Sequence, residues 1–184
     1  MVAAVLLAAG SGSRFDGETH KLLAPLRGRA VVAHALDAVR ASGLEVYVVT
    51  GAVDLADVLA DDVHIVHNPD WADGQATSVR AAIEAATADG HDAVVVGLGD
   101  QPFVTADAWR AVAAADDLPL AVATYGGRRG HPVRLDASVW ELLPTTGDEV
   151  GRVIMQGRPD LVRPIPCAGH ATDIDTLEDL HRWT

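Results

Sequence analysis

The sequence has 184 residues, of which 49% are hydrophobic and only 4% aromatic, a globular composition. Its 26 acidic residues outnumber its 14 basic residues, and the net charge of −12 argues against non-specific binding to nucleic acid or to an anionic membrane. Any polyanionic ligand must therefore be held locally, by aimed cations, backbone N–H groups or a metal ion. Cys167 is the one cysteine, which excludes an internal disulfide, and no apolar run approaches the ~20 residues that span a bilayer. We expect a cytoplasmic protein with one domain over residues 1–184.

The predicted elements alternate between strands and helices along the chain. Apolar runs predict strands at residues 2–9, 46–50, 63–67, 93–98, 120–124, 132–135 and 161–165. Helical spacing and helix-start residues predict helices at 31–41, 53–59, 105–115, 137–143 and 148–155, one that carries Val79 to Ala86, and a short one near the C-terminus. The first third implies parallel strands with right-handed crossovers, and Pro164 places the late strand at a sheet edge. The pattern predicts an α/β fold, a three-layer sandwich.

A loop of small residues follows the first strand. Residues 10–13 read Gly-Ser-Gly-Ser, and the cations Arg14 and Lys21 follow closely. Small side chains leave backbone N–H groups accessible, and accessible N–H groups beside cations form an anion-binding site. The alternative is an ordinary glycine turn after a first strand.

Two common phosphate-binding motifs do not fit this loop. A dinucleotide-binding fingerprint needs a third glycine, whereas the bulky Phe15 stands after Arg14. A P-loop needs a lysine after its last glycine, whereas Gly17 is followed by Glu18, whose carboxylate repels a triphosphate.

Ligands of open α/β sheets lie beyond the carboxyl ends of the strands, and this rule selects three places. They are the loop at 10–13, the loop at 68–78 and Asp100. A carboxylate held rigidly at a strand end, in a chain that binds phosphate, indicates Mg²⁺. The alternative, Asp100 as the cap of the next helix, is weaker because Thr105 is better placed for that role.

Asp173 and Asp175 form a second acidic feature near the C-terminus. They are two residues apart and therefore lie on the same side of an extended segment. One of them is a candidate second metal ligand, and the alternative for the pair is capping of the last helix.

Taken in order, these segments resemble the nucleotidyltransferases related to molybdenum-cofactor cytidylyltransferases. The resemblance rests on Leu7-Ala8-Ala9-Gly10, Arg14, Lys21-Leu22-Leu23, Asn68-Pro69-Asp70-Trp71 with Gly74 and Ser78, Gly99-Asp100-Gln101-Pro102, Gly130-His131-Pro132-Val133 and Asp173-Ile174-Asp175-Thr176. Two departures are a longer gap between Arg14 and Lys21 and Leu177 in place of a usual proline.

The resemblance implies a mostly parallel, Rossmann-like sheet in an α/β/α sandwich of the nucleotide-diphospho-sugar transferase type. It also implies Mg²⁺-dependent transfer of CMP from CTP to the phosphate of molybdenum-bearing molybdopterin, for use by a molybdenum hydroxylase apoenzyme. Lys21 and Arg14 are then the catalytic cations, and Asp100 and Asp175 the metal ligands, with Asp173 as the alternative to Asp175. The implied nucleotide-binding residues are Leu7, Ala8, Ala9, Gly10, Gly12, Asn68, Gly74 and Ser78, and the implied acceptor-binding residues are Gly130, His131 and Pro132. By the same resemblance, Asn68 to Ser78 form the base-side loop, in which Gly74 admits the base and the start of the next helix offers N–H donors to it.

Two other functions remain open from the sequence. A nucleotidyltransferase acting on a sugar-1-phosphate or a polyol phosphate uses the same first loop. A non-catalytic accessory protein that carries the pterin cofactor keeps the acceptor side and loses Lys21 or Asp100. Both residues are present, which favours an enzyme.

Overall fold

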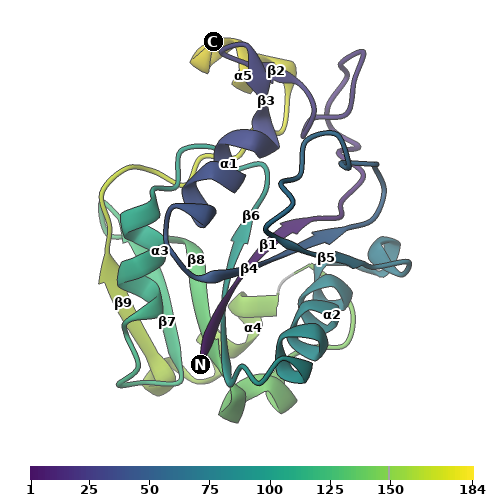
Figure 1. Cartoon of the computed structure of the whole chain (residues 1–184). Helices are drawn as coiled ribbons and strands as arrows, with labels where there is room; N and C mark the ends of the chain where they lie inside the picture. Colours follow the sequence, from purple (N-terminus) through teal and green to yellow (C-terminus); the bar gives the residue numbers. More distant parts are fainter. Residues whose placement is uncertain (149) are drawn as a thin grey trace.

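The computed structural model of the chain describes residues 1–148 and 150–184 (Figure 1). Within these residues, a seven-stranded sheet has the order β5-β4-β1-β6-β8-β7-β9. The strands are β1 Val2–Ala8, β4 Glu45–Thr50, β5 His64–His67, β6 Ala93–Leu98, β7 Leu120–Tyr125, β8 Arg128–Asp136 and β9 Val162–Pro166. A separate hairpin consists of β2 Pro25–Leu26 and β3 Arg29–Ala30, joined by the tight turn at Arg27 and Gly28, both with positive φ.

Helices cover both faces of the sheet, which confirms the three-layer sandwich (Figure 1). The helices are α1 Val31–Arg40, α2 Gln75–Ala88, α3 Ala106–Ala113, α4 Val150–Gly157 and α5 Leu177–Trp183, and the 3₁₀ turns are η1 Trp71–Asp73, η2 Ala137–Leu142 and η3 Pro159–Leu161. Alternate residues of β1 pack against α2 and α4 on one face and against α1 and α3 on the other. None of these helices, in the part of the chain that is described, is both long and apolar enough to cross a membrane.

The central strand β1 sets the geometry of the sheet. It pairs in parallel with β4 and β6, and its residues 3–6 have no exposed surface, as the unbroken apolar run predicts. β5 and β9 also pair in parallel with their neighbours, whereas β8 is antiparallel to β6 and β7. The sheet is therefore mostly parallel, and the carboxyl ends of β1 and β6 lie next to each other, with Leu7 beside Leu98.

Several element boundaries differ from the sequence prediction. Residues 53–59 contain one turn, at 56–58, and not a helix: Leu59 N donates to Leu55 O at 3.0 Å, but this single helical turn is not continued. Helix α2 begins at Gln75, so it starts before the segment from Val79 to Ala86 in which a helix was predicted. The expected helix at 148–155 corresponds to α4, and Glu149 within that range lies outside the described residues. The short strand expected at 132–135 is the longer β8, while β9 lies at the sheet edge as predicted.

Candidate active site

A pocket of about 420 Å³ opens at the carboxyl ends of β1 and β6. Ten of the sequence-predicted site residues line it: Leu7, Ala8, Ala9, Gly10, Gly12, Arg14, Lys21, Ser78, Asp100 and Asp175. Ser13, Leu22 and Trp71, which stand in the same motifs, also line it, and so do Gln75, Leu98 and Asp148, to which the sequence analysis gave no role. The pocket contains four aspartates, Asp100, Asp148, Asp173 and Asp175, against the two cations Arg14 and Lys21.

Backbone hydrogen bonds bring the acidic residues to the glycine loop from distant parts of the chain. Gly99 N donates to Leu7 O at 2.8 Å, which fixes the exit of β6 against the end of β1. Ile174 N donates to Asp100 O at 2.9 Å, and the Ile174 side chain is fully buried in a small core with Leu26. Burial of this one side chain between the two aspartates holds Asp173 and Asp175 at the pocket.

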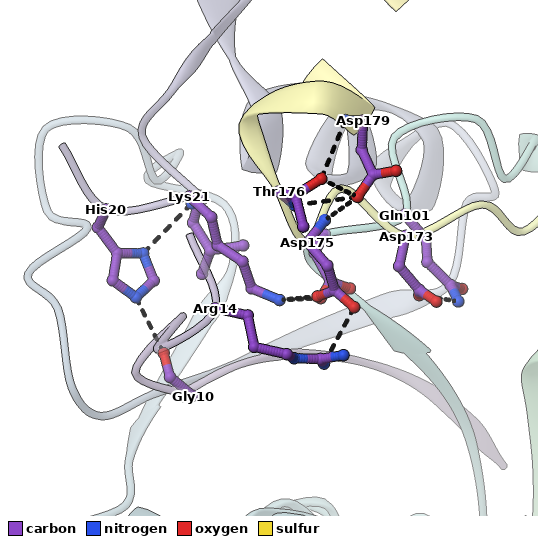
Figure 2. A network of polar contacts seen from close by, with 11 residues as sticks. Gly10, Arg14, His20, Lys21, Gln101, Asp173, Asp175, Thr176 and Asp179 are labelled. Atoms are coloured by element: carbon purple, nitrogen blue, oxygen red, sulfur yellow. Dashed lines mark hydrogen bonds and ion pairs between the residues drawn. The ribbon is translucent and has the colours of Figure 1, made fainter. Parts of the chain in front are cut away.

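Lys21 joins the two predicted metal ligands. Its Nζ atom lies 2.5 Å from Asp100 Oδ2 and 2.8 Å from Asp175 Oδ1, and its side chain is only 13% exposed. Arg14 approaches the same aspartate, with a guanidinium nitrogen 3.0 Å from Asp175 Oδ2 (Figure 2). Burial alone lowers the pKa of Lys21, but the carboxylates of Asp100 and Asp175 outweigh burial and raise its pKa, so the ammonium stays protonated.

Asp173 lies in the same pocket but has a different partner. Gln101 Nε2 donates to Asp173 Oδ1 at 2.7 Å, as Figure 2 shows. Burial raises the pKa of Asp173, and the neighbouring Asp100 and Asp175 charges act in the same direction. Neither aspartate caps helix α5, because Thr176 is its N-cap and forms a capping box with Asp179.

The donor set fits a hard divalent cation. Asp100 Oδ1 is buried, and no hydrogen-bond partner reaches it from the described residues. Mg²⁺ is usually bound through one or two carboxylates and the phosphates of a substrate, and Asp100 and Asp175 already share one cation. A second group of side chains that could hold a metal consists of Glu45, His64 and Asp89, and all three are exposed. Glu45 and His64 are the first residues of β4 and β5, so this group lies at the amino ends of these strands, away from the pocket.

His20, which the sequence analysis did not consider, links the longer segment between Arg14 and Lys21 to the glycine loop by hydrogen bonds. His20 Nδ1 accepts from Leu22 N at 3.2 Å, so its Nε2 donates to Gly10 O at 3.0 Å, as expected of a neutral ring. Burial lowers the pKa of His20, in agreement with that assignment. Gly12 has φ +63°, and a Cβ there would lie 3.1 Å from Lys21 Cγ, so this glycine admits the lysine stem.

Two residues of the predicted base-side loop lie outside the pocket. Asn68 and Gly74 do not line the pocket. The buried Asn68 side chain donates to the hydroxyls of Thr77 at 2.8 Å and Ser78 at 2.9 Å, and so anchors the start of α2. The first N–H groups of α2 are also taken, since Gln75 N donates to Asp148 Oδ1 and Ala76 N to Gly147 O. The helix N-terminus therefore does not offer these donors to a base, contrary to the sequence-based expectation.

A glycine is needed at position 74 because the backbone of Gly147 lies very close to it. Gly74 has φ +108°, and a Cβ on it would lie 2.6 Å from the Gly147 backbone. We expect Gly74→Ala to lower the free energy of unfolding by about 1–3 kcal/mol, measured by urea denaturation. Gly127→Ala is the matched control, because Gly127 has φ +81° and nothing lies within 4 Å of its Cβ position. An equal loss in both variants would leave only the backbone conformation as the cause.

The predicted acceptor residues Gly130, His131 and Pro132 lie on β8 and do not line this pocket. Burial lowers the pKa of His131 to about 4, against the opposing effect of the Asp100 carboxylate, so the imidazole is neutral at pH 7. Tyr125 Oη donates to His131 O at 2.8 Å and holds this part of the strand.

The family model described as a MobA-like NTP transferase domain matches residues 4–162, which include the glycine loop, Lys21 and Asp100. The chain belongs to this family. The expected nucleotidyltransferase is thereby confirmed at the level of the domain, and so is the expected fold.

Curated relatives of this MobA-like domain include proteins named bifunctional protein GlmU. The protein from Symbiobacterium thermophilum is 36% identical over 107 residues, which are 56% of this chain and 22% of that protein. The protein from Dinoroseobacter shibae is 33% identical over 159 residues, which are 83% of this chain and 34% of that protein. The chain therefore spans only part of the length of these relatives.

Solved structures match the MobA-like domain over nearly its whole length. A nucleotidyl transferase from Methanothermobacter thermautotroptrophicus has a TM-score of 0.85 at 26% identity, covering 99% of this chain and 95% of that one. Rv0371c from Mycobacterium tuberculosis H37Rv has a TM-score of 0.80 at 28% identity, covering 99% and 96%. Another structure of Rv0371c, at a TM-score of 0.77 and 27% identity over 99% and 97%, is a complex with manganese. Use of a divalent metal is typical of nucleotidyltransferases of this type.

Proposed function

We propose that this single domain of 184 residues transfers CMP from CTP to the phosphate of a molybdopterin-type acceptor and releases pyrophosphate. The observation that carries the proposal is the contact of Lys21 with both Asp100 and Asp175, beside the glycine loop. A cation and two carboxylates beside a loop of small residues suit the transfer of a nucleotidyl group. The proposed setting is the cytoplasm, with a molybdenum hydroxylase as the recipient of the product.

Catalysis of this reaction depends on positioning the two substrates and on stabilising negative charge in the transition state, and less on proton transfer. An acceptor phosphate is already anionic at neutral pH, so its oxygen attacks the α-phosphorus in line without a general base. Backbone N–H groups at Gly10 and Gly12 hold the phosphates, and Arg14 and Lys21 neutralise the charge that develops on them. Asp100 and Asp175 would hold Mg²⁺, which supplies Lewis-acid stabilisation of the phosphate oxygens.

A second candidate is transfer to a sugar phosphate, which the likeness to the GlmU proteins favours. Mass spectrometry of the product separates the two candidates. Purified protein is incubated with each of the four NTPs and with either molybdopterin or sugar-1-phosphates. A cytidine dinucleotide of the pterin is the expected product, and a nucleotide sugar formed in its place would reject the pterin acceptor.

We expect CTP to be preferred over GTP as the nucleotide. Ala9 lines the pocket next to Gly10, and we expect its methyl group to narrow the space available to a purine. Competition kinetics with both nucleotides present measure the ratio of the two kcat/KM values, for which we expect about tenfold or more in favour of CTP. Equal or better use of GTP would refute this preference. Ala9→Gly is the matched variant and should narrow the ratio.

A further inference from the structure

Lys21 contacts the oxygen atoms that the proposed metal ion needs. Its ammonium nitrogen lies 2.5 Å from Asp100 Oδ2 and 2.8 Å from Asp175 Oδ1. Mg²⁺ binds carboxylate oxygens at about 2.0–2.1 Å. The ammonium group and the ion therefore compete for the same pair of oxygens, because two cations this close together repel each other.

Asp100 and Asp175, two of the four aspartates in the pocket, are already paired with cations without a metal ion. The two carboxylates of Asp100 and Asp175 face the two cations Lys21 and Arg14. The Lys21 and Asp100 side chains are only 13% and 16% exposed, so water screens these charges weakly. A divalent cation that approached these two carboxylates would meet repulsion from the two cations and would have to displace them from three of the four carboxylate oxygens.

We propose that Lys21 is an internal cation that keeps the divalent ion out of the site until the nucleotide phosphates draw its ammonium away from Asp100 and Asp175. This inference rests on the proposed function, which takes the two aspartates as metal ligands and a triphosphate as the substrate. Phosphate oxygens give Lys21 and Arg14 new partners and leave the carboxylates to the ion. Metal binding and nucleotide binding are then coupled through Lys21, and each strengthens the other by the same factor.

The surroundings of Lys21 allow this exchange. The Lys21 side chain packs against Gly12, where its Cγ atom lies 3.1 Å from the position that a Cβ on Gly12 would take. The aliphatic part of Lys21 therefore lies against the loop that is proposed to hold the phosphates. The flexible end of a lysine side chain can move between the two sets of oxygens while the stem stays in place.

Titration with Mn²⁺ in the absence of nucleotide tests the exchange, with electron paramagnetic resonance reporting the free ion. We expect Lys21→Met to bind Mn²⁺ about tenfold or more tightly than the unmodified protein, because the competing cation is gone. Arg40→Met removes the same charge from an exposed pair with Asp62 and should bind like the unmodified protein. Equal Mn²⁺ affinity of the Lys21→Met variant and the unmodified protein would overturn the proposal.

A second titration in the presence of a non-hydrolysable CTP analogue measures the coupling. The analogue should tighten Mn²⁺ binding by a larger factor in the unmodified protein than in Lys21→Met, and an equal factor would overturn the role of Lys21. Asp100→Asn distinguishes this failure from failure of the proposed function. If that variant binds Mn²⁺ normally in the presence of the analogue, the metal site itself lies elsewhere and both proposals fall.

Lys21 is the only lysine in the sequence, which permits a test without substitution. Labelling lysine side chains with ¹⁵N gives one side-chain ammonium signal in the spectrum of the unmodified protein. The signal should shift when Mg²⁺ and the CTP analogue are both present at saturation, because the ammonium exchanges carboxylate partners for phosphate. An unchanged signal in the saturated complex contradicts the exchange, whether or not Lys21→Met folds.

Discussion

Replacing Lys21 by alanine is expected to lower kcat about 10²–10³-fold, the usual loss when one preorganised donor to the transition state is removed. The ammonium is held at the pocket by two carboxylates and stays charged, so it is ready to meet the charge that develops at the α-phosphate. Steady-state rates of pyrophosphate release, measured with saturating CTP and acceptor, give the loss directly.

The fold should survive this substitution, because the Lys21 side chain ends in a polar cluster and not in the core. Circular dichroism melting curves check that point. Arg40→Ala is the control, since it removes one positive charge from the exposed ion pair with Asp62, outside the pocket. Near-normal turnover by Lys21→Ala would show that Lys21 takes no part in the chemistry and only forms ion pairs with Asp100 and Asp175.

The fold could be predicted from the sequence at those segments whose residue pattern is compatible with only one kind of secondary structure. The unbroken apolar runs of β1 and β6 are buried on both faces of the sheet, which only a central strand achieves. The segment at 53–59 was predicted to be a helix, but it forms a single helical turn that is not continued. A segment of seven residues gains too few backbone hydrogen bonds to stabilise a helix by itself, and the predicted helix there was wrong.

The site was predictable in its residue types and less so in its contacts. The rule that ligands lie beyond strand ends correctly places the glycine loop and Asp100 at one pocket. Gly74, in contrast, was interpreted as room for a base, whereas its missing side chain admits Gly147. Gly147 is 73 positions away from Gly74 along the chain. A contact between residues so far apart cannot be predicted from a local pattern in a single sequence.

Asp100→Asn is expected to weaken Mg²⁺-dependent binding of CTP about tenfold or more, which corresponds to at least ~1.4 kcal/mol. The substitution keeps the shape of the side chain and removes its charge, so folding should change little. Asp175→Asn should have a similar but smaller effect, because Asp175 is more exposed than Asp100 and also contacts Arg14. Calorimetric titration of CTP with and without Mg²⁺ measures both variants.

Asp173→Asn is the matched control for these two variants, since it makes the same chemical change in the same pocket. The Asp173 carboxylate accepts from Gln101 and not from Lys21, so it lies outside the cluster that we expect the ion to enter. Its replacement should therefore leave the Mg²⁺ dependence of CTP binding nearly intact. If Asp173→Asn is the damaging change and Asp175→Asn is silent, the two aspartates exchange roles. If Asp100→Asn binds CTP like the parent, the ion is held by other oxygens, and the contact of Lys21 with Asp100 is a structural ion pair only.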